Sequence, residues 1–152
     1  MTVSIREFQP ADWPTLWPIL HSVFSRGDTY TYPPDATEDQ IHALWIERPE
    51  ATFVACNGAG EVIGSYYIRP NQQGNAGHVC NCGYVVAEAA RGAGVAAQMC
   101  AHSQGQAIER GYLAMQFNFG VSTNPGAVGL WQRLGYEIVG TLSRAFRHPK
   151  AG

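Results

Sequence analysis

Charged residues are scarce in this chain. Asp, Glu, Lys and Arg make up 14% of its 152 residues, whereas soluble domains commonly carry roughly 25%. The ten basic and twelve acidic residues leave a net charge of −2, so we expect no basic surface for nucleic acid. A surface with few charges favours contact with another protein surface, most simply in a homodimer.

Long apolar runs are also missing. The sequence has no run of about 20 apolar residues that could span a membrane, and its N-terminus lacks the charged and then apolar pattern of a signal peptide. We therefore expect a cytoplasmic protein without a membrane partner. A length of 152 residues suits a single domain, residues 1–152, with a sizeable core.

Cysteine is limited to Cys56, Cys80, Cys82 and Cys100. A zinc site usually needs a second pair of ligands, and the sequence has no such pair beside Cys80 and Cys82, so we expect no metal. A disulfide between residues two apart in a strand would be strained. The sequence therefore predicts buried free thiols.

The most informative segment is residues 85–99, with the sequence VVAEAARGAGVAAQM. A β-branched run ends at Val86, and a loop from Arg91 to Gly94 opens a stretch of helical character. Bare backbone N–H groups and a helix N-terminus can together hold a phosphate. The spacing is not G-x-G-x-x-G, and no Lys-Ser or Lys-Thr follows, so dinucleotide and nucleoside triphosphate loops fit poorly. A strand–helix turn without any ligand is the alternative interpretation.

Hydrophobic periodicity and turn residues predict a mixed α/β fold, with helices on both faces of a mixed sheet. Six strands are expected, over residues 2–8, 51–56, 62–69, 78–86, 113–121 and 137–142. Four helices are expected, over residues 12–24, 37–48, 95–110 and 124–134. Either a further strand beyond this sequence pairs with residues 137–142, or that strand leaves an open sheet edge, which is a hazard for association.

Two segments together resemble the GCN5-related N-acetyltransferase (GNAT) family. Residues 91–96, RGAGVA, resemble the R/Q-x-x-G-x-G/A loop that grips the pyrophosphate of acetyl-CoA, and residues 124–131, NPGAVGLW, followed by LGY, resemble the N-x-x-A-x-x-L-Y segment. The resemblance implies an acyl-CoA N-acyltransferase fold, in which the strands ending at Val86 and Val121 splay apart around the CoA cleft. The segments GDTYTYPPD and MQFNFGVSTNPGAVGLWQRLGYEIVG are similar to the branch of the yeast proline-analogue (azetidine-2-carboxylate) N-acetyltransferases.

The resemblance also implies which residues bind acetyl-CoA, the expected co-substrate. The main chain of Val86 would pair with the pantetheine arm like an added strand. Asn124 would contact pantetheine, although Asn before Pro is also simply a good helix cap. The expected cofactor-binding residues are Val86, Arg91, Gly92, Ala93, Gly94, Val95, Ala96 and Asn124.

Three residues match catalytic positions of the family. The backbone N–H of Tyr84 would stabilise the oxyanion as an amine attacks the thioester, an effect of about 3 kcal/mol for one good donor. Asn81 and Asn118 match the paired asparagines of the proline-analogue enzymes and would hold the acceptor. The alternatives are a bulge residue at Asn81 and a satisfied buried amide at Asn118. Trp131 replaces the tyrosine that many relatives use as a general acid, and an indole N–H cannot serve as that acid.

Tyr30 and Tyr32 are expected to wall the acceptor pocket, with Tyr66 and Tyr67, although tyrosines at a dimer interface would look the same. No general base is evident, and His78 is expected to be exposed at a strand start. The sequence thus predicts an acetyl-CoA-dependent N-acetyltransferase. It would act on the amine of a small molecule, such as an amino acid or proline analogue, by direct attack in a ternary complex. Two alternatives stay open: a non-catalytic acyl-CoA-binding module, and a protein or peptide N-acetyltransferase.

Overall fold

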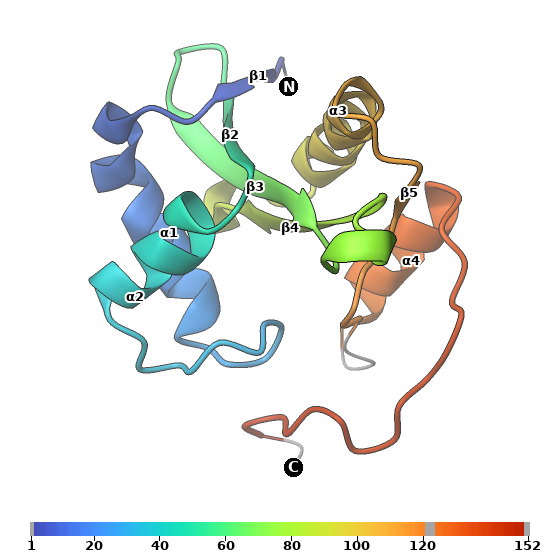
Figure 1. The fold of residues 1–152 in the computed structure, drawn as a ribbon. Coiled ribbons are helices and arrows are strands. Elements are labelled where there is room, and N and C mark those ends of the chain that lie inside the picture. Colours follow the sequence, from blue (N-terminus) through green and yellow to red (C-terminus); the bar gives the residue numbers. More distant parts are fainter. Residues whose placement is uncertain (1, 121–123, 151–152) are drawn as a thin grey trace.

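The computed structural model describes residues 2–120 and 124–150. Its centre is a five-stranded sheet in the order β1-β2-β3-β4-β5 (Figure 1). The strands are β1 (Ser4–Glu7), β2 (Ala51–Cys56), β3 (Val62–Pro70), β4 (Val79–Val86) and β5 (Ala114–Met115). Neighbouring strands are antiparallel, except that β4 and β5 run parallel. The predicted mixed sheet is therefore confirmed.

Helices lie on both faces of this sheet, as predicted. The α-helices are α1 (Trp13–Phe24), α2 (Glu38–His42), α3 (Val95–Glu109) and α4 (Pro125–Arg133). Shorter helical turns are η1 (Pro10–Asp12), η2 (Ala43–Glu47), η3 (Gly74–Ala76) and η4 (Glu88–Ala90). In Figure 1, α1 and α2 lie on one side of the sheet, and α3 lies on the other.

The two faces arise from the alternation of side chains along the strands. Val54 and Tyr67 belong to the core that packs against α1 and α2, whereas Phe53 and Tyr66 belong to the core that packs against α3. Each core therefore takes every second residue of β2, and the alternation along β3 is interrupted where the β2–β3 register shifts beside Ala55 and Cys56. The site described below lies beside β4, beyond the point where its pairing with β5 ends.

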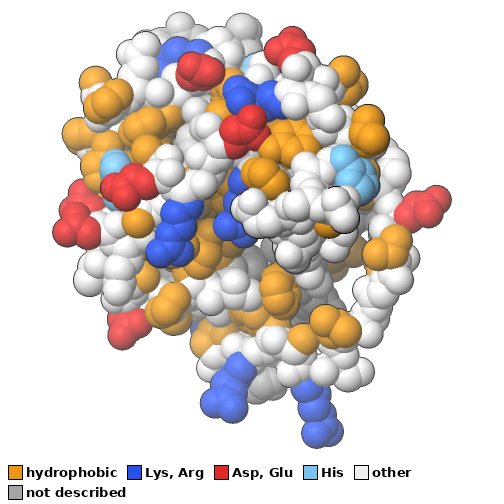
Figure 2. Space-filling view, viewed as in Figure 1, with side chains coloured by type: hydrophobic (Ala, Val, Ile, Leu, Met, Phe, Trp, Pro, Cys, Tyr) orange, Lys and Arg blue, Asp and Glu red, His pale blue; other side chains and the backbone are white. Residues whose placement is uncertain are grey.

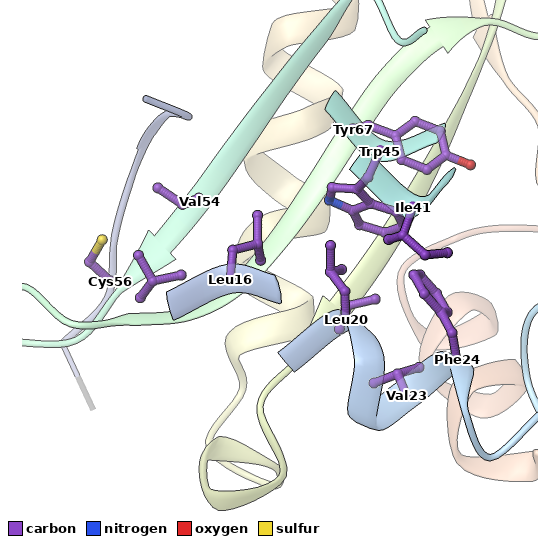
Figure 3. Packing of buried hydrophobic residues seen from close by; sticks show 11 residues of the cluster. Leu16, Leu20, Val23, Phe24, Ile41, Trp45, Val54, Cys56 and Tyr67 are labelled. Carbon is purple, nitrogen blue, oxygen red and sulfur yellow. The ribbon is translucent and has the colours of Figure 1, made fainter. Parts of the chain in front are cut away.

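Trp45 anchors the core under α1 and α2 (Figure 3). Its side chain is fully buried in the cluster that contains Leu16, Leu20 and Phe24. Trp45 Nε1 donates to Ser65 Oγ at 2.9 Å, so the buried indole nitrogen has a partner. Residues 37–48 are helical in large part, as predicted, but α2 passes into the π-helical turn η2, which contains Trp45.

The strand β5 is much shorter than predicted. The sequence predicts a strand over residues 113–121, but only Ala114–Met115 is strand, and residues 121–123 lie outside the described residues. After β5, Phe117 packs against Trp131 and Tyr136, with ring centroids 4.9 Å and 4.6 Å apart. This aromatic cluster takes the described chain away from β4, so most of that edge of β4 is open.

The strand predicted over residues 137–142 is wrong. The chain there is irregular, and Ile138, Val139 and Leu142 are 60%, 92% and 76% exposed. A two-residue β5 offers too short a ladder for another strand to extend. The described sheet therefore has five strands rather than six.

Candidate active site

A cavity of about 600 Å³ lies where β4 and β5 diverge. Its wall is built from the end of α1 and the loop that follows, from β3 and β4, from the loop before α3, and from α4. Figure 2 shows hydrophobic and basic side chains gathered around a hollow on this face. The predicted site residues in the lining are Tyr30, Asn81, Tyr84, Val86, Arg91, Ala96, Asn118 and Asn124.

The backbone of β4 presents every second residue to this cavity. Gln116 N donates to Cys80 O at 2.8 Å on the β5 side. The N–H and C=O groups of one strand residue point to the same side, and the side alternates along the strand. Those of Tyr84 and Val86 therefore also point toward the β5 side. Because β5 ends at Met115, these groups face the cavity instead of a neighbouring strand.

Tyr30 engages one of these groups. Its hydroxyl donates to the carbonyl oxygen of Tyr84 at 2.8 Å. Burial, with the neighbouring Tyr67, raises the pKa of the Tyr30 phenol well above its usual range, so the hydroxyl keeps its proton and remains a donor. Tyr32 stacks on Tyr30, with centroids 5.6 Å apart, and lies behind it rather than in the lining.

Tyr84 and Tyr66 place their side chains on the opposite face of the sheet, toward α3. The Tyr84 hydroxyl lies 2.6 Å from Ser103 Oγ, and the Tyr66 hydroxyl lies 2.7 Å from His102 Nδ1. Burial raises the pKa of both phenols. The expectation that Tyr66 walls the acceptor pocket is therefore wrong, because β3 alternation turns it away. Tyr84 offers the cavity its backbone and not its phenol.

Asn81 is 6% exposed and lies in the wall of the cavity. Its Nδ2 donates to Gln116 O at 2.9 Å, and its Oδ1 accepts from the Tyr67 hydroxyl at 3.4 Å. The amide is therefore held in one orientation from both ends. The β3–β4 register is regular through Arg69 and Asn81, so Asn81 is not a bulge residue.

The sequence predicts Asn118 within a strand, but the structure places it in a bend after β5. Asn118 is exposed, so it is not the buried amide of the alternative interpretation. Its Nδ2 donates to Asn71 Oδ1 at 2.8 Å, and its Oδ1 accepts from Gln116 Nε2 at 3.3 Å. These bonds tie the bend to the chain that follows β3. Asn118 and Asn81 line the same cavity, although they do not stand on two long splayed strands.

The glycine loop precedes α3 at the other end of β4. Gly92 and Gly94 have φ angles of +79° and +78°, which L side chains rarely adopt. Gly94 is the N-cap of α3, and no side chain caps that end, so the first backbone N–H groups of the helix stay available for an anion. A Cβ at either glycine would meet no atom within 4 Å, so the space above the loop is open.

The remaining loop residues divide between surface and core. Arg91 is exposed, and together with Ala96 it lines the cavity. Ala93 lies between the two glycines and packs partly against the core under α3. Val95 is 2% exposed in that core, so its side chain anchors the start of α3 and only its backbone faces the loop.

Asn124 and Trp131 bring α4 into the cavity wall. Asn124 is the N-cap residue of α4, but its side chain makes no capping hydrogen bond. The structure therefore does not support the interpretation that the Asn124 side chain serves as a helix cap. The Trp131 ring lies 5.1 Å from the Tyr84 ring, centroid to centroid, and it packs in the aromatic cluster that also holds Phe117.

The cavity contains charged and polar residues that the sequence patterns do not single out. Arg26, Asp28, Arg69 and His148 line it. Arg26 Nε lies 3.6 Å from Asp28 Oδ1, a buried oxygen without a hydrogen-bond partner among the described residues. The Arg69 guanidinium lies over the Tyr67 ring, 5.4 Å from its centroid. The scarcity of charge in this chain could have indicated these residues, because each arginine or aspartate is more informative where charged residues are few.

The four cysteines are free and buried, as predicted. Within residues 2–120 and 124–150, no cluster of three or more His, Cys, Asp or Glu side chains could hold a metal ion. In the same residues, no helix has the length and apolar character needed to cross a membrane.

Comparison with known proteins shows that this chain is similar to acetyltransferases. Residues 13–136 match the model of the Acetyltransferase (GNAT) family. The structure of a GCN5-related N-acetyltransferase from Kribbella flavida is 40% identical, with a TM-score of 0.93 over 99% of this chain and 91% of that chain. A phosphinothricin acetyltransferase from Sinorhizobium meliloti, solved in complex with AcCoA, shares the fold. It is 20% identical, with a TM-score of 0.77 over 92% of this chain and 77% of that chain.

A curated relative is more distant. N-acetyltransferase aca1 from Schizosaccharomyces pombe is 27% identical over 99 residues, which are 65% of this chain and 47% of the relative. The match therefore spans about half of that protein's length.

Proposed function

This chain belongs to the acetyltransferase (GNAT) family, and on that premise we propose that it transfers the acetyl group of acetyl-CoA to the amine of a small molecule. One observation carries the proposal. The open edge of β4 at Tyr84 and Val86 and the uncapped glycine loop before α3 border the same cavity. An extended ligand with a phosphate group at one end fits that combination.

The cavity and loop residues would bind acetyl-CoA along β4. The exposed main-chain groups of Val86 would pair with the amides of pantetheine like an added strand. Residues 91–96 would hold the pyrophosphate through backbone N–H groups and the partial positive charge of α3. Asn124, whose side chain is not used as a cap, would contact pantetheine from the other side.

The Tyr84 N–H would act on the reacting carbonyl. As the amine nitrogen bonds to the acetyl carbon, negative charge develops on the carbonyl oxygen, and a fixed N–H there contributes about 3 kcal/mol. The carbon–sulfur bond then breaks, the nitrogen loses its proton, and the products are an amide and free CoA. A thiol with an ordinary pKa of about 8.5 is a tolerable leaving group without an acid, which suits a site with Trp131 in place of tyrosine.

Asn81 and Asn118 would position the acceptor. The two fixed amides lie in the wall of the cavity, where they can orient an amine for attack. Replacing either by Ala should lower kcat for amine acetylation, while the Kd of acetyl-CoA stays close to the unsubstituted value. Equal losses of cofactor affinity and turnover would instead indicate a general structural role.

The experiment that tests the function is the release of CoA thiol from acetyl-CoA in the presence of a panel of amines, amino acids and proline analogues. We expect amine-dependent release with at least one small acceptor. Binding of acetyl-CoA without release for any amine would favour a non-catalytic acyl-CoA-binding module. Release with peptides alone would make the protein a peptide N-acetyltransferase.

We also propose a homodimer. The described surface exposes Ile108 and Leu113 by 76% and 81%, which adds apolar area to a weakly charged chain. Light scattering should give twice the chain mass of 16.5 kDa, and a monomer at all concentrations would contradict this.

A further inference from the structure

Arg69 lines the cavity beside the first part of β4, whereas the glycine loop follows the end of that strand. Its cross-strand partner is Asn81, and Tyr67, two residues earlier on β3, shares its face of the sheet. Gly83 makes room for this arrangement, because a Cβ there would lie 2.5 Å from Tyr67 Cε2. The Tyr67 ring therefore crosses β4 and reaches Asn81, while the Arg69 guanidinium lies over the ring at 5.4 Å.

The charge of Arg69 is not neutralised by the described protein. No Asp or Glu side chain in the described residues lies within ion-pair distance of it. Asp28 is the acidic residue in the described lining, and it pairs with Arg26 instead. Arg69 is partly buried. A guanidinium that stacks on an aromatic ring keeps its N–H edge free, and that edge matches a carboxylate with two parallel hydrogen bonds.

The position of Arg69 separates it from the phosphates of the proposed co-substrate. Asn81 and Val86 are five residues apart on an extended strand, or about 17 Å, and the glycine loop lies beyond Val86. Arg69 is level with Asn81, so it faces the acceptor end of the cavity. The anion that it would bind belongs to the acceptor and not to CoA.

We propose that Arg69 binds the carboxylate of the acceptor, and that the acceptor class is amino or imino acids that carry the amine and the carboxylate on the same carbon atom. This inference rests on the proposed acetyltransferase function. It makes Arg69, with Asn81 and Tyr67 beside it, the residue that determines specificity for a carboxylate.

The test compares acceptors that differ only in the carboxylate. CoA release is measured with azetidine-2-carboxylate against azetidine, proline against pyrrolidine, and alanine against ethylamine, for the unsubstituted protein and for Arg69→Gln. Within each pair, we compare kcat/KM for the carboxylate acceptor with kcat/KM for its decarboxylated partner. Because the basicity of each amine is the same for both proteins, a change in this ratio between the proteins reports the effect of Arg69. We expect the unsubstituted protein to prefer the carboxylate member of at least one pair. Arg69→Gln should raise the KM of that member at least tenfold and leave its decarboxylated partner within about twofold.

Two further variants keep the test decisive. Arg69→Lys retains the positive charge but cannot form two parallel hydrogen bonds to a carboxylate, so its KM for the carboxylate acceptor should be intermediate. This variant tests the inference even if Arg69→Gln does not fold. Arg133 is exposed and lies outside the cavity lining. Arg133→Gln should therefore leave the KM of both members of each acceptor pair unchanged. Preference for the decarboxylated amines, or an equal loss for both members in Arg69→Gln, would overturn the inference but leave the transferase function intact. No CoA release from any compound would overturn the transferase function, and the carboxylate inference with it.

Discussion

The hydroxyl of Tyr30 donates a hydrogen bond to the backbone carbonyl of Tyr84 at 2.8 Å. This bond fixes a peptide group on the open edge of β4 from a loop that is more than fifty residues away in sequence. The N–H of Tyr84 points to the same side as its carbonyl. A side chain from the first third of the chain therefore stiffens the backbone group that we place at the reacting carbonyl.

Replacing Tyr30 by Phe keeps the ring and removes this bond. We expect a loss of about 0.5–1.5 kcal/mol in the free energy of unfolding and a fall in kcat of roughly tenfold, because the oxyanion donor is less well fixed. Tyr66→Phe is the matched control, since it removes a hydroxyl contact to His102 on the opposite face. If Tyr66→Phe lowers kcat as much as Tyr30→Phe, the link between Tyr30 and the reacting carbonyl is wrong.

Replacing Gly94 by Val should weaken CoA binding by at least an order of magnitude, because the side chain blocks close approach of a phosphate to the loop. Gly60→Val is the control, since Gly60 has a similar φ of +82° and equally open space around its Cβ. Both variants should lose about 1–3 kcal/mol of stability to backbone strain, and only Gly94→Val should lose affinity in calorimetry. Unchanged affinity in folded Gly94→Val would remove the phosphate from this loop.

Asn124 offers a test of ligand against helix cap. Because its side chain makes no capping bond, Asn124→Ala and Asn124→Asp should both keep the melting temperature, and both should raise the KM of acetyl-CoA. Thr37→Ala is the reference for a true cap, because Thr37 Oγ1 accepts from Gln40 N, and it should cost about 1 kcal/mol. A similar loss of stability in Asn124→Ala, with normal cofactor kinetics, would reduce Asn124 to a cap.

The rate of acetyl transfer should climb with pH as the acceptor ammonium loses its proton, without a plateau near the ordinary histidine pKa of about 6.5. His78 is exposed and outside the lining, whereas His148 is in it. A plateau near pH 6.5 that disappears in His148→Gln and persists in His78→Gln would give the site a histidine base. That result would contradict a mechanism without a side-chain base.

Stability has its own pH dependence through His102. Burial lowers the pKa of this imidazole in the folded state, so the unfolded chain binds the proton more readily. Folding stability should therefore be highest above the unfolded pKa of about 6.5 and fall as the pH drops through the folded pKa. Denaturant unfolding at several pH values should show this fall, and His102→Gln should flatten it. The same slope in the variant would assign the effect to other groups.

The sequence predicted most of the fold because its strongest signals are local. The β-rich runs that form β2, β3 and β4, and the glycine that starts α3, depend on neighbours within a few residues. The strands predicted over residues 113–121 and 137–142 depended on a partner strand instead. Phe117 packs with Trp131 and Tyr136, a contact between distant segments that periodicity does not contain. The shortened β5 accompanies that contact, and the described residues hold five strands rather than six.

The candidate site was predictable where the backbone or a motif defined it. The loop at Arg91, the edge at Val86 and the amide of Asn81 all line the cavity. Tyr66 was assigned to the wrong face because one residue of register decides the face of a strand. Arg69 was missed because its meaning depends on Asn81 across the sheet and on the lack of an acidic partner in the described residues, which are properties of the fold.

A crystal structure of the protein with acetyl-CoA would test the central claim most directly. The account predicts pantetheine alongside the open edge of β4, paired with the main chain of Val86, and pyrophosphate on residues 91–96. It predicts the thioester oxygen about 2.7–3.1 Å from the N–H of Tyr84. Acetyl-CoA bound elsewhere, or bound in the cavity with its carbonyl turned away from Tyr84, would contradict it.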